Sequence, residues 1–562
     1  MSASPAAKVW PVDRRGALLL AVAAVVVWII LPTAPNYDTA THLMWAGELL
    51  GGRAPDVSAD ASPTLHPLWL VVAVPAAATG MGAAWLQLVA LLSFAVVIAC
   101  AYRLATDVAG WIAGAFAAVA VASSFALMLL AFKAYVDLPF LALVLTALVV
   151  EWSSDRAEGA VRADQADRGA AEGEPPVAAS RSEAVAHPLV VPGLLFTAGL
   201  LRPEAWAFGV LFVALRVVRG STVREQVVPA AVVLAAPVLW LLTDLLLTGE
   251  PLHSLTGTQA LAEELGRKTG LAAAPRELAV LLSDLARPPV AAAGVLGVAL
   301  AVRLRGWRAL LLPLTVLAAA GAGFLLVGAL GLPLLQRYLL VPAVLVCVFA
   351  GVAGGVVLAW ARGRRDPGGA FEGDRSSEGI DASGESVETD SPAAVGRRDR
   401  PGSPVSADAG VPTALRLGAT AALVVGLIGV GGYLVLKAES FKIVGQGVLR
   451  EARWQREGAE LLADPAVIAA ARCGPITLPT YRFIPELTLR ADLPEGAVVS
   501  RSTALGGAGP QENGVAIVID GNRAAKVRLG WAAGVPRTTN QIPPGFGEIA
   551  RRGPFVATAR CA

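Results

Sequence analysis

Long apolar runs separated by short polar segments occupy most of the first 437 residues. Many of the runs have about the 20 apolar residues that a helix needs to cross a hydrocarbon layer of roughly 30 Å. The runs cover residues 17–34, 84–104, 109–131, 133–151, 189–201, 203–217, 226–247, 289–303, 309–331, 338–360 and 413–437. The pattern predicts an all-α polytopic membrane domain with about 11 transmembrane helices.

Two apolar segments do not fit a simple crossing. Residues 67–79 are too few to span a bilayer and contain Pro75, so we expect them to be re-entrant or to lie at the interface. The run 189–217 is interrupted by Arg202 and Glu204. Charges at the centre of a bilayer would cost roughly 2.5–3.5 kcal/mol each, and two short helices that meet at the outer surface avoid this cost.

The composition excludes several classes of protein. Hydrophobic residues make up 55% of the 562 residues and charged residues only 16%, which is not the composition of a soluble chain. A soluble enzyme, a disordered regulator and a disulfide scaffold are therefore excluded. The formal net charge of +2 provides no concentrated basic surface, so no nucleic acid is expected as a partner.

The basic residues predict how the helices are oriented, because Lys and Arg in short loops favour the cytoplasmic side. Threading the apolar runs between the basic clusters places the N-terminus in the cytoplasm and residues 438–562 outside it. The clusters placed inside are Arg103, residues 152–188, Arg216 with Arg219 and Arg224, Arg303 with Arg305 and Arg308, and Arg362 with Arg364 and Arg365. We expect a multi-pass protein of the cell membrane.

The long polar stretches predict the domain organisation. Residues 152–188 and 362–412 contain almost no large apolar residues, so we expect disordered cytoplasmic linkers within a membrane domain of residues 1–437. Residues 438–562 differ, because a helical pattern is followed by strand-like runs such as 514–519. We expect a small extracytoplasmic α+β domain there.

The C-terminal segment begins with the helical pattern, over residues 447–462, and contains two cysteines. Cys473 and Cys561 bracket its polar part, whereas Cys100 and Cys347 lie in apolar runs. Only the first pair could form a disulfide, and an oxidising compartment outside the cytoplasm would favour it. The sequence alone leaves this pairing open.

Polar residues of the types used in catalysis gather at the predicted outer ends of helices rather than at mid-membrane. They comprise Asp38, His42, Glu48, His66, Lys133, Asp137, Arg202, Glu204, His253, Arg337 and Tyr338. Asp38 and His42 are four residues apart, so on a helix they would share one face. Clustering at one surface favours an enzyme that acts on a membrane substrate.

The order of these residues resembles that of the polytopic glycosyltransferases of the GT-C fold, which include protein mannosyltransferases and the lipid A aminoarabinose transferase. The resemblance covers residues 15–350. It rests on Tyr37-Asp38, His66-Pro67, Asp137-Leu138-Pro139, the segment from Leu201 to Trp206, the segment from Thr248 to Pro251, and Arg337-Tyr338 with Pro342. No single motif is diagnostic, and their order along the chain carries the resemblance.

The resemblance implies a polyprenyl-phosphate sugar donor, whose tail lies among the membrane lipids, and an extracytoplasmic acceptor that is a glycan, a lipid or a protein. It also implies inversion at the anomeric carbon. Asp38 is the candidate general base, because a positioned carboxylate can take the proton of the acceptor hydroxyl. Many members carry two adjacent acids where Thr39 follows Asp38 here, and Glu48 and Asp137 are the candidates for the second catalytic acid.

The same resemblance implies residues that contact the substrates. Arginine offers paired hydrogen bonds to phosphate oxygens and lysine a point charge. The candidates for holding the leaving phosphate are Lys133, Arg202 and Arg337, and the further candidates for substrate contact are Glu204, Tyr338 and His66.

No cofactor is assigned from the sequence, and a divalent metal is left open. Members of the family differ in metal dependence, and Asp38, His42, His66 and His253 are of suitable ligand types, but their scatter over separate loops is a weak signal.

Two other classes of function remain as alternatives. A transporter or lipid flippase of cell-envelope precursors would require broken helices or charges near the midplane. A scaffold that binds a partner through its C-terminal domain would not need about 11 helices as its anchor.

Overall fold

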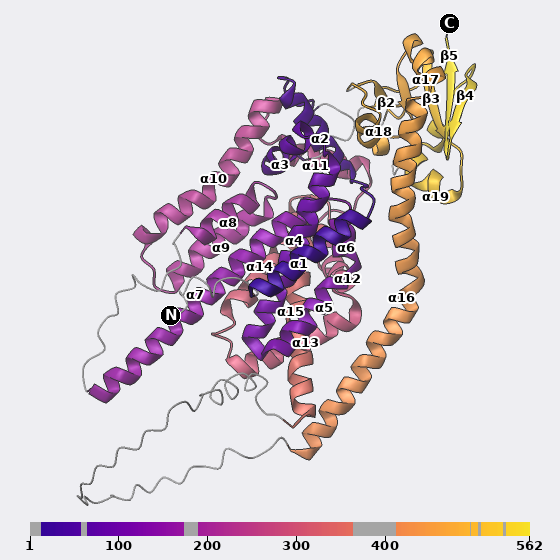
Figure 1. Ribbon diagram of the computed structural model, residues 1–562. Helices are drawn as coiled ribbons and strands as arrows, with labels where there is room; N and C mark the ends of the chain where they lie inside the picture. The colour runs from indigo at the N-terminus through magenta and orange to yellow at the C-terminus, as the bar shows by residue number, and fades with distance from the viewer. Residues whose placement is uncertain are drawn as a thin grey trace, which may run out of the picture.

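The computed structural model describes residues 13–57, 64–172, 189–363, 412–494, 496–503, 507–531 and 535–561. Helices form the membrane domain, and a small sheet with short helices forms the C-terminal domain (Figure 1). The membrane-domain helices are α1 (Arg14–Ile30), α2 (Tyr37–Leu50), α3 (Pro67–Ala78), α4 (Ala83–Ala109), α5 (Trp111–Ala122), α6 (Phe125–Phe132), α7 (Asp137–Glu172), α8 (Val190–Gly199), α9 (Glu204–Val218), α10 (Val223–Thr248), α11 (His253–Glu264), α12 (Ala274–Ala286), α13 (Pro288–Arg305), α14 (Leu311–Ala329), η2 (Gln336–Leu339), α15 (Leu340–Ala361) and α16 (Thr413–Leu462). The predicted fold class, a helical membrane domain followed by a small α+β domain, is confirmed.

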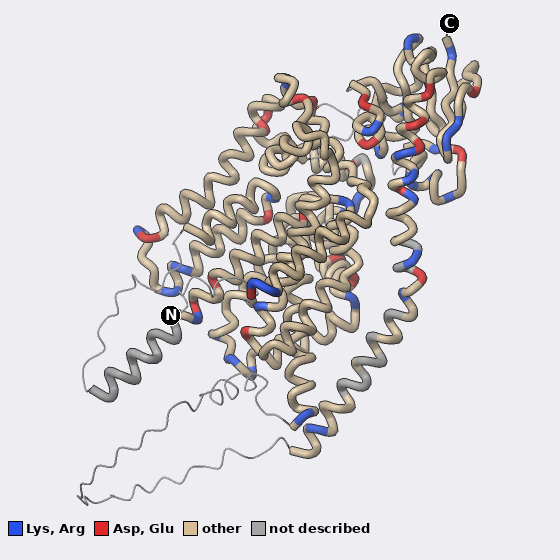
Figure 2. Tube along the Cα trace, viewed as in Figure 1, with Lys and Arg blue, Asp and Glu red and all other residues tan. Residues whose placement is uncertain are grey.

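The chain is a multi-pass membrane protein. Within the described residues, six helices are long and apolar enough to cross a membrane, and the pair α5 and α6, bent by 58°, makes a seventh if it counts as one span. The six are α4, Asp137–Ala157 of α7, α10, α13, α14 and Gln336–Ala361. Figure 2 shows that charged residues concentrate towards the helix ends and in the C-terminal domain.

The predicted count of about 11 transmembrane helices is not confirmed. α8 and α9 have only 10 and 15 residues. At a rise of about 1.5 Å per residue, neither reaches across roughly 30 Å of hydrocarbon alone. Their separation is as predicted, because α8 ends at Gly199 and α9 begins at Glu204.

Three other segments bear on the sequence predictions. α3 has 12 residues and continues through Pro75, so it is too short to cross a bilayer, as expected. Residues 152–172, where the sequence analysis expected the start of a disordered linker, belong to α7. The rest of that predicted linker, residues 173–188, lies outside the described residues, as does almost all of the second, at 364–411.

α15 is the central helix of the bundle. Most of its residues are buried, and it packs mainly against α13 and α5. Small residues permit this close approach: a Cβ atom on Gly297 of α13 would lie 1.8 Å from the carbonyl oxygen of Phe349. The packing fixes the position of η2, which immediately precedes α15 and carries Arg337.

A single helix connects the membrane domain with the C-terminal domain (Figure 1). α16 is continuous over 50 residues, whereas the sequence analysis separated a span at 413–437 from a helical pattern at 447–462. The polarity changes between these segments, but no proline interrupts them, so the helix continues. The predicted domain boundary at residue 438 therefore falls within α16.

The C-terminal domain is built on a five-stranded mixed sheet. Its elements are α17 (Pro465–Ala470), η3 (Ala471–Cys473), β1 (Ile476–Leu478), η4 (Tyr481–Phe483), α18 (Ile484–Arg490), β2 (Val498–Ser500), β3 (Gly514–Ile519), α19 (Arg523–Ala525), η6 (Lys526–Gly530), η7 (Arg537–Asn540), β4 (Gly547–Arg552) and β5 (Phe555–Arg560). The strand order is β2-β1-β3-β5-β4, with β2, β1 and β3 parallel and the β3–β5 and β5–β4 pairs antiparallel. β3 is apolar and buried throughout, as expected for a central strand covered on both faces.

Cys473 and Cys561 form a disulfide in this domain, with Cα atoms 5.4 Å apart. Because the bond joins residues 88 positions apart, replacing both cysteines with serine should lower the free energy of unfolding by about 2–4 kcal/mol. Thermal unfolding in detergent and protease resistance of the domain would measure the loss. Alanine at the buried free cysteines Cys100 and Cys347 is the control, and equal protease resistance in the serine variant would contradict the prediction.

Candidate active site

The first turn of α2 is held against the turn between α6 and α7. Asn36 caps α2 by accepting a hydrogen bond from the backbone N–H of Thr39 (3.1 Å), and its amide donates to the carbonyl oxygen of Lys133 (2.9 Å). The Thr39 hydroxyl donates to the carbonyl oxygen of Ala134 (2.6 Å). Ala134 has a φ of 56°, a left-handed conformation that a residue with a Cβ adopts only under constraint. These contacts fix Asp38, which lies between the two anchoring residues of α2.

Asp38 meets Arg337, a residue 299 positions away in the sequence. Oδ2 of Asp38 lies 3.5 Å from Nη1 of Arg337, and the two side chains are 28% and 26% exposed. Nε of Arg337 is buried and has no hydrogen-bond partner within the described part of the chain, so this N–H can serve another acceptor.

Arg202 lies buried between two carboxylates. Its guanidinium forms ion pairs with Asp137, which is fully buried, and with Glu204, whose Oε1 is 2.5 Å from Nη2. The guanidinium also lies over the rings of Phe140 (5.7 Å) and Tyr338 (5.3 Å). Since two carboxylates surround one guanidinium, this group supplies fixed hydrogen-bond donors but no excess positive charge.

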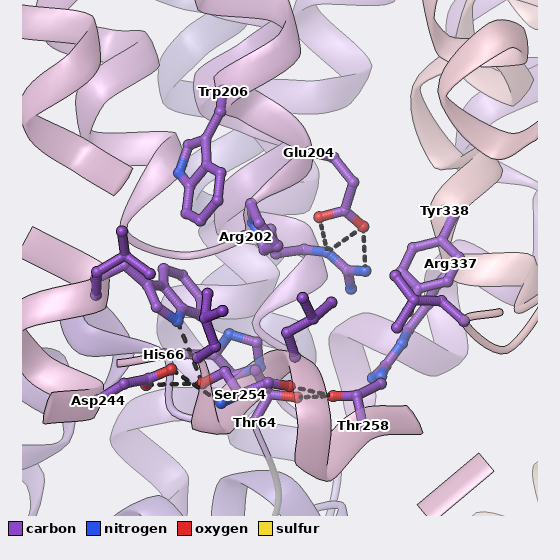
Figure 3. Close-up of a pocket in the computed structure, with 16 residues that line it drawn as sticks. Thr64, His66, Arg202, Glu204, Trp206, Asp244, Ser254, Thr258, Arg337 and Tyr338 are labelled. Carbon is purple, nitrogen blue, oxygen red and sulfur yellow. Dashed lines mark hydrogen bonds and ion pairs between the residues drawn. The ribbon is translucent and has the colours of Figure 1, made fainter. Parts of the chain in front are cut away.

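A cavity of about 180 Å³ opens beside the two arginines (Figure 3). Its wall includes Arg202, Glu204, Trp206, Trp240, Arg337 and Tyr338. The lining is mostly apolar with a few polar groups, which is the usual composition of a site for an organic ligand.

α10 and α11 supply a further polar part of this wall. Asp244 accepts two hydrogen bonds from Ser254, one from the backbone N–H and one from the hydroxyl, both at 2.8 Å. Nε1 of Trp240 in turn donates to the Ser254 hydroxyl (3.2 Å). The hydroxyls of Thr64 and Thr258 lie 3.1 Å apart in the same wall. These bonds hold the Trp240 ring and the Asp244 carboxylate in place.

Two buried histidines connect the cavity to Asp38. Nδ1 of His42 donates to the carbonyl oxygen of Asp38 (2.6 Å), and its Nε2 accepts from the backbone N–H of His66 (3.3 Å). The two imidazole rings stack with centroids 5.5 Å apart. Burial lowers the pKa of His42 to about 4. Burial, followed by electrostatic opposition from the neighbouring His42 and Arg202 to a further positive charge, holds the pKa of His66 well below its usual value. Both rings are therefore neutral at pH 7.

Lys133 lies at the contact between the two domains. It is 5% exposed, and its ammonium pairs with Glu451 of α16 (2.5 Å). Arg528 of the C-terminal domain binds the same carboxylate (2.9 Å). Glu486 of α18 completes this junction, and its Oε2 is buried without a hydrogen-bond partner among the residues described.

The C-terminal domain also forms part of the surroundings of Asp38. The ring of Tyr481 packs edge-on against Tyr37, with centroids 5.5 Å apart. Arg267, which follows α11, lies close enough to Arg337, Tyr481 and Asp38 for their charges to act on it. Burial, and next the like charge of Arg337, lowers the pKa of Arg267.

The structure brings most of the predicted site residues together. Those in or beside the cavity are Asp38, His66, Arg202, Glu204, Arg337 and Tyr338. Asp137 lies behind Arg202, and Lys133 faces Glu451, so neither lines the cavity. Glu48 accepts a hydrogen bond from the backbone N–H of Asp56 and so holds the loop that follows α2.

Several residues of the site were missed by the sequence analysis. Trp206, Trp240 and Arg267 have no signature in the sequence, since tryptophan near helix ends is common in membrane proteins. Asp244 does have one, because a carboxylate at the end of a long apolar run is costly unless it has partners or a role. In the part of the chain that the structure describes, no three His, Cys, Asp or Glu side chains are grouped to hold a metal ion.

Comparisons with known proteins give a likeness in structure only. No protein-family model matches the chain. No curated protein matches it either. Two crystal structures of ArnT from Cupriavidus metallidurans, one bound to undecaprenyl phosphate and one in the apo state, align over 97% of this chain and 98% of theirs, at 15% identity and TM-scores of 0.48 and 0.49. This likeness does not define the substrates of the present chain.

We expect Glu486 to make the domain junction sensitive to pH. Burial raises the pKa of this carboxyl to about 8, so the folded protein retains a proton that the unfolded chain has lost above about pH 4.3. Its stabilising contribution is therefore present at low pH and is lost as pH rises towards 8, by up to about 1.4 kcal/mol per pH unit. Protease release of the C-terminal domain should be faster at pH 8 than at pH 5.5.

The variant Glu486→Gln is the matched control, because it keeps the shape and cannot lose a proton. Its protease release should vary less with pH than that of the unaltered protein. Identical pH profiles for the two proteins would show that Glu486 does not titrate as described.

Proposed function

We propose that this chain is a membrane glycosyltransferase that transfers a sugar from a polyprenyl-phosphate donor to an extracytoplasmic acceptor. The observation that carries the proposal is the pairing of a partly exposed carboxylate, Asp38, with Arg337 at the edge of a mostly apolar cavity. The transfer needs a base for the acceptor, a cation for the leaving phosphate and an enclosed site, and these three elements meet here.

Arg337 is the main group proposed to hold the donor phosphate. Its Nε has no partner within the described residues, and its contact with Asp38 is long, at 3.5 Å. Arg202 and Tyr338 line the same cavity, and the buried ion pair with Asp137 holds the guanidinium of Arg202 in a fixed direction. Preorganised donors of this kind stabilise the negative charge that develops on a departing phosphate.

Asp38 is proposed to act as the general base. It takes the proton of the acceptor hydroxyl while the hydroxyl oxygen bonds to the anomeric carbon, and the bond from that carbon to the phosphate oxygen breaks. The polyprenyl phosphate leaves with the electron pair of the broken bond, and the anomeric configuration inverts, as the sequence resemblance implies. We assign Asp137 a positioning role through Arg202 because it is fully buried, and Lys133 a role in holding the turn beside α2.

The site and the C-terminal domain are proposed to face the extracytoplasmic side, with the N-terminus in the cytoplasm. The disulfide between Cys473 and Cys561 supports this side, because such bonds persist in oxidising compartments. The distribution of basic residues in the loops supports the same orientation. A comparison of the envelope glycans of cells with and without the protein would identify the transferred sugar and its carrier.

The variant Asp38→Asn should lose sugar transfer, because an amide cannot accept the proton. We expect a decrease of about 10²- to 10⁴-fold in the rate of transfer from labelled polyprenyl-phosphate sugars in membranes, with unchanged protein level. Glu263→Gln, at an exposed position of α11, is the control. Full activity of Asp38→Asn would remove the assignment of the base.

The variants Arg337→Ala and Arg202→Ala should weaken use of the donor more than Asp38→Asn does. Loss of a charge-assisted hydrogen bond should raise the apparent KM for the donor about 10- to 100-fold. Arg202→Ala should also reduce stability, since it leaves Asp137 buried without its ion-pair partner. Arg308→Ala, at an exposed position between α13 and α14 outside the cavity lining, is the control, and an unchanged donor KM in both test variants would contradict phosphate contact.

A further inference from the structure

His66 has a ring nitrogen that no residue in the described part of the chain satisfies with a hydrogen bond. The residue is 5% exposed, lines the cavity, and its Nδ1 has no hydrogen-bond partner within the described part of the chain. A buried polar atom without a partner costs free energy, so it indicates a place where a ligand supplies the missing bond.

The contacts of His66 determine what kind of bond is missing. The backbone of Leu201 acts on the pKa of His66 as a hydrogen-bond acceptor, and because Nδ1 has no partner among the described residues we infer that Nε2 is the ring nitrogen that faces this carbonyl oxygen. A carbonyl oxygen only accepts, so Nε2 carries the proton. The ring is neutral, and therefore Nδ1 is unprotonated and presents a lone pair.

A lipid-linked sugar has three parts: the sugar, the phosphate and the isoprenoid tail. The lone pair on Nδ1 excludes two of them as its hydrogen-bond partner. A phosphate diester offers only acceptor oxygens, and an isoprenoid tail offers no polar group, so neither can donate to Nδ1. A sugar hydroxyl or amino group can donate. The rest of the wall agrees with a sugar, because the indoles of Trp206 and Trp240 provide aromatic surfaces and Glu204 and Asp244 provide further acceptors.

Arg337 lies between this part of the cavity and the proposed base, Asp38. It lines the cavity and also contacts Asp38. A phosphate held by Arg337 would therefore have the cavity of His66 on one side and the proposed base on the other. In this arrangement the sugar occupies the cavity and the acceptor approaches from the side of Asp38.

We propose that the cavity beside Arg202 and Arg337 binds the glycosyl group of the donor, and that Nδ1 of His66 accepts a hydrogen bond from one of its hydroxyl or amino groups. The inference rests on the proposed function, which it deepens by separating the sugar subsite from the phosphate contact. His66 thus distinguishes a glycosylated polyprenyl phosphate from the free polyprenyl phosphate that remains after transfer.

Binding of two kinds of lipid to the full-length protein in detergent tests this subsite. The probes are decaprenyl phosphate and its glucosyl, mannosyl and arabinosyl phosphodiesters. The variant His66→Phe keeps a flat ring but removes the lone pair, whereas His66→Gln keeps an acceptor oxygen. We expect His66→Phe to weaken binding of the preferred glycosylated lipid about 10- to 100-fold and to leave decaprenyl phosphate unchanged, with partial recovery in His66→Gln. Arg337→Ala should weaken both lipids.

The outcomes separate this inference from the proposed function. If the unaltered protein binds neither kind of lipid, the proposed function fails and the subsite fails with it. If it binds both but His66→Phe weakens both equally or neither, only the subsite is overturned. Should His66→Phe not fold, deoxy analogues of the preferred sugar on the unaltered protein replace it: one deletion should cost about 10- to 100-fold, and no effect at any position would overturn the inference.

Discussion

The buried ion pair between Arg202 and Asp137 is the interaction on which the arrangement of the site depends. It joins the start of α7 to the break between α8 and α9, two places 65 positions apart in the sequence. A guanidinium buried among apolar helices is stable only with a carboxylate at hydrogen-bonding distance, and removing either partner leaves a costly isolated charge. The pair lies at the break between α8 and α9, where Pro203 cannot continue the preceding helix. It also sets the direction in which Arg202 presents its remaining donors to the cavity.

The turn at residues 133–136 contributes both to the site and to the contact between the two domains. Its carbonyl groups accept hydrogen bonds from Asn36 and Thr39, which position Asp38, while the side chain of Lys133 reaches Glu451 on α16. Glu451 binds Arg528 of the C-terminal domain as well. The C-terminal domain is thus connected to the first turn of α2 through three adjacent contacts, and it is part of the wall around Asp38 rather than a separate appendage.

The sequence was most informative where a residue type permits only one structural interpretation. Apolar runs located the helices, and the charged break at Arg202 and Glu204 was interpreted correctly because charges within a membrane have few alternatives. The order of polar residues along the chain led us to expect Asp38 and Arg337 in one site, although no local pattern links positions so far apart. In the structure the two side chains are in contact. Partners such as Glu451 and Arg528 could not be predicted, since their roles come from tertiary contacts between distant segments. The domain boundary expected from polarity, at residue 438, lies inside α16, because a change from apolar to charged residues does not end a helix.

The continuity of α16 has a mechanical consequence. A helix of 50 residues is about 75 Å long, and it curves from the membrane domain to the core of the C-terminal domain without an interruption. A thicker or thinner bilayer would change the tilt of the membrane end of α16. Because the helix is long, a small change of tilt there would produce a larger displacement at its far end. Because Glu451 on this helix binds Lys133, a displacement of α16 would act on the turn whose carbonyl groups hold Asn36 and Thr39 beside Asp38.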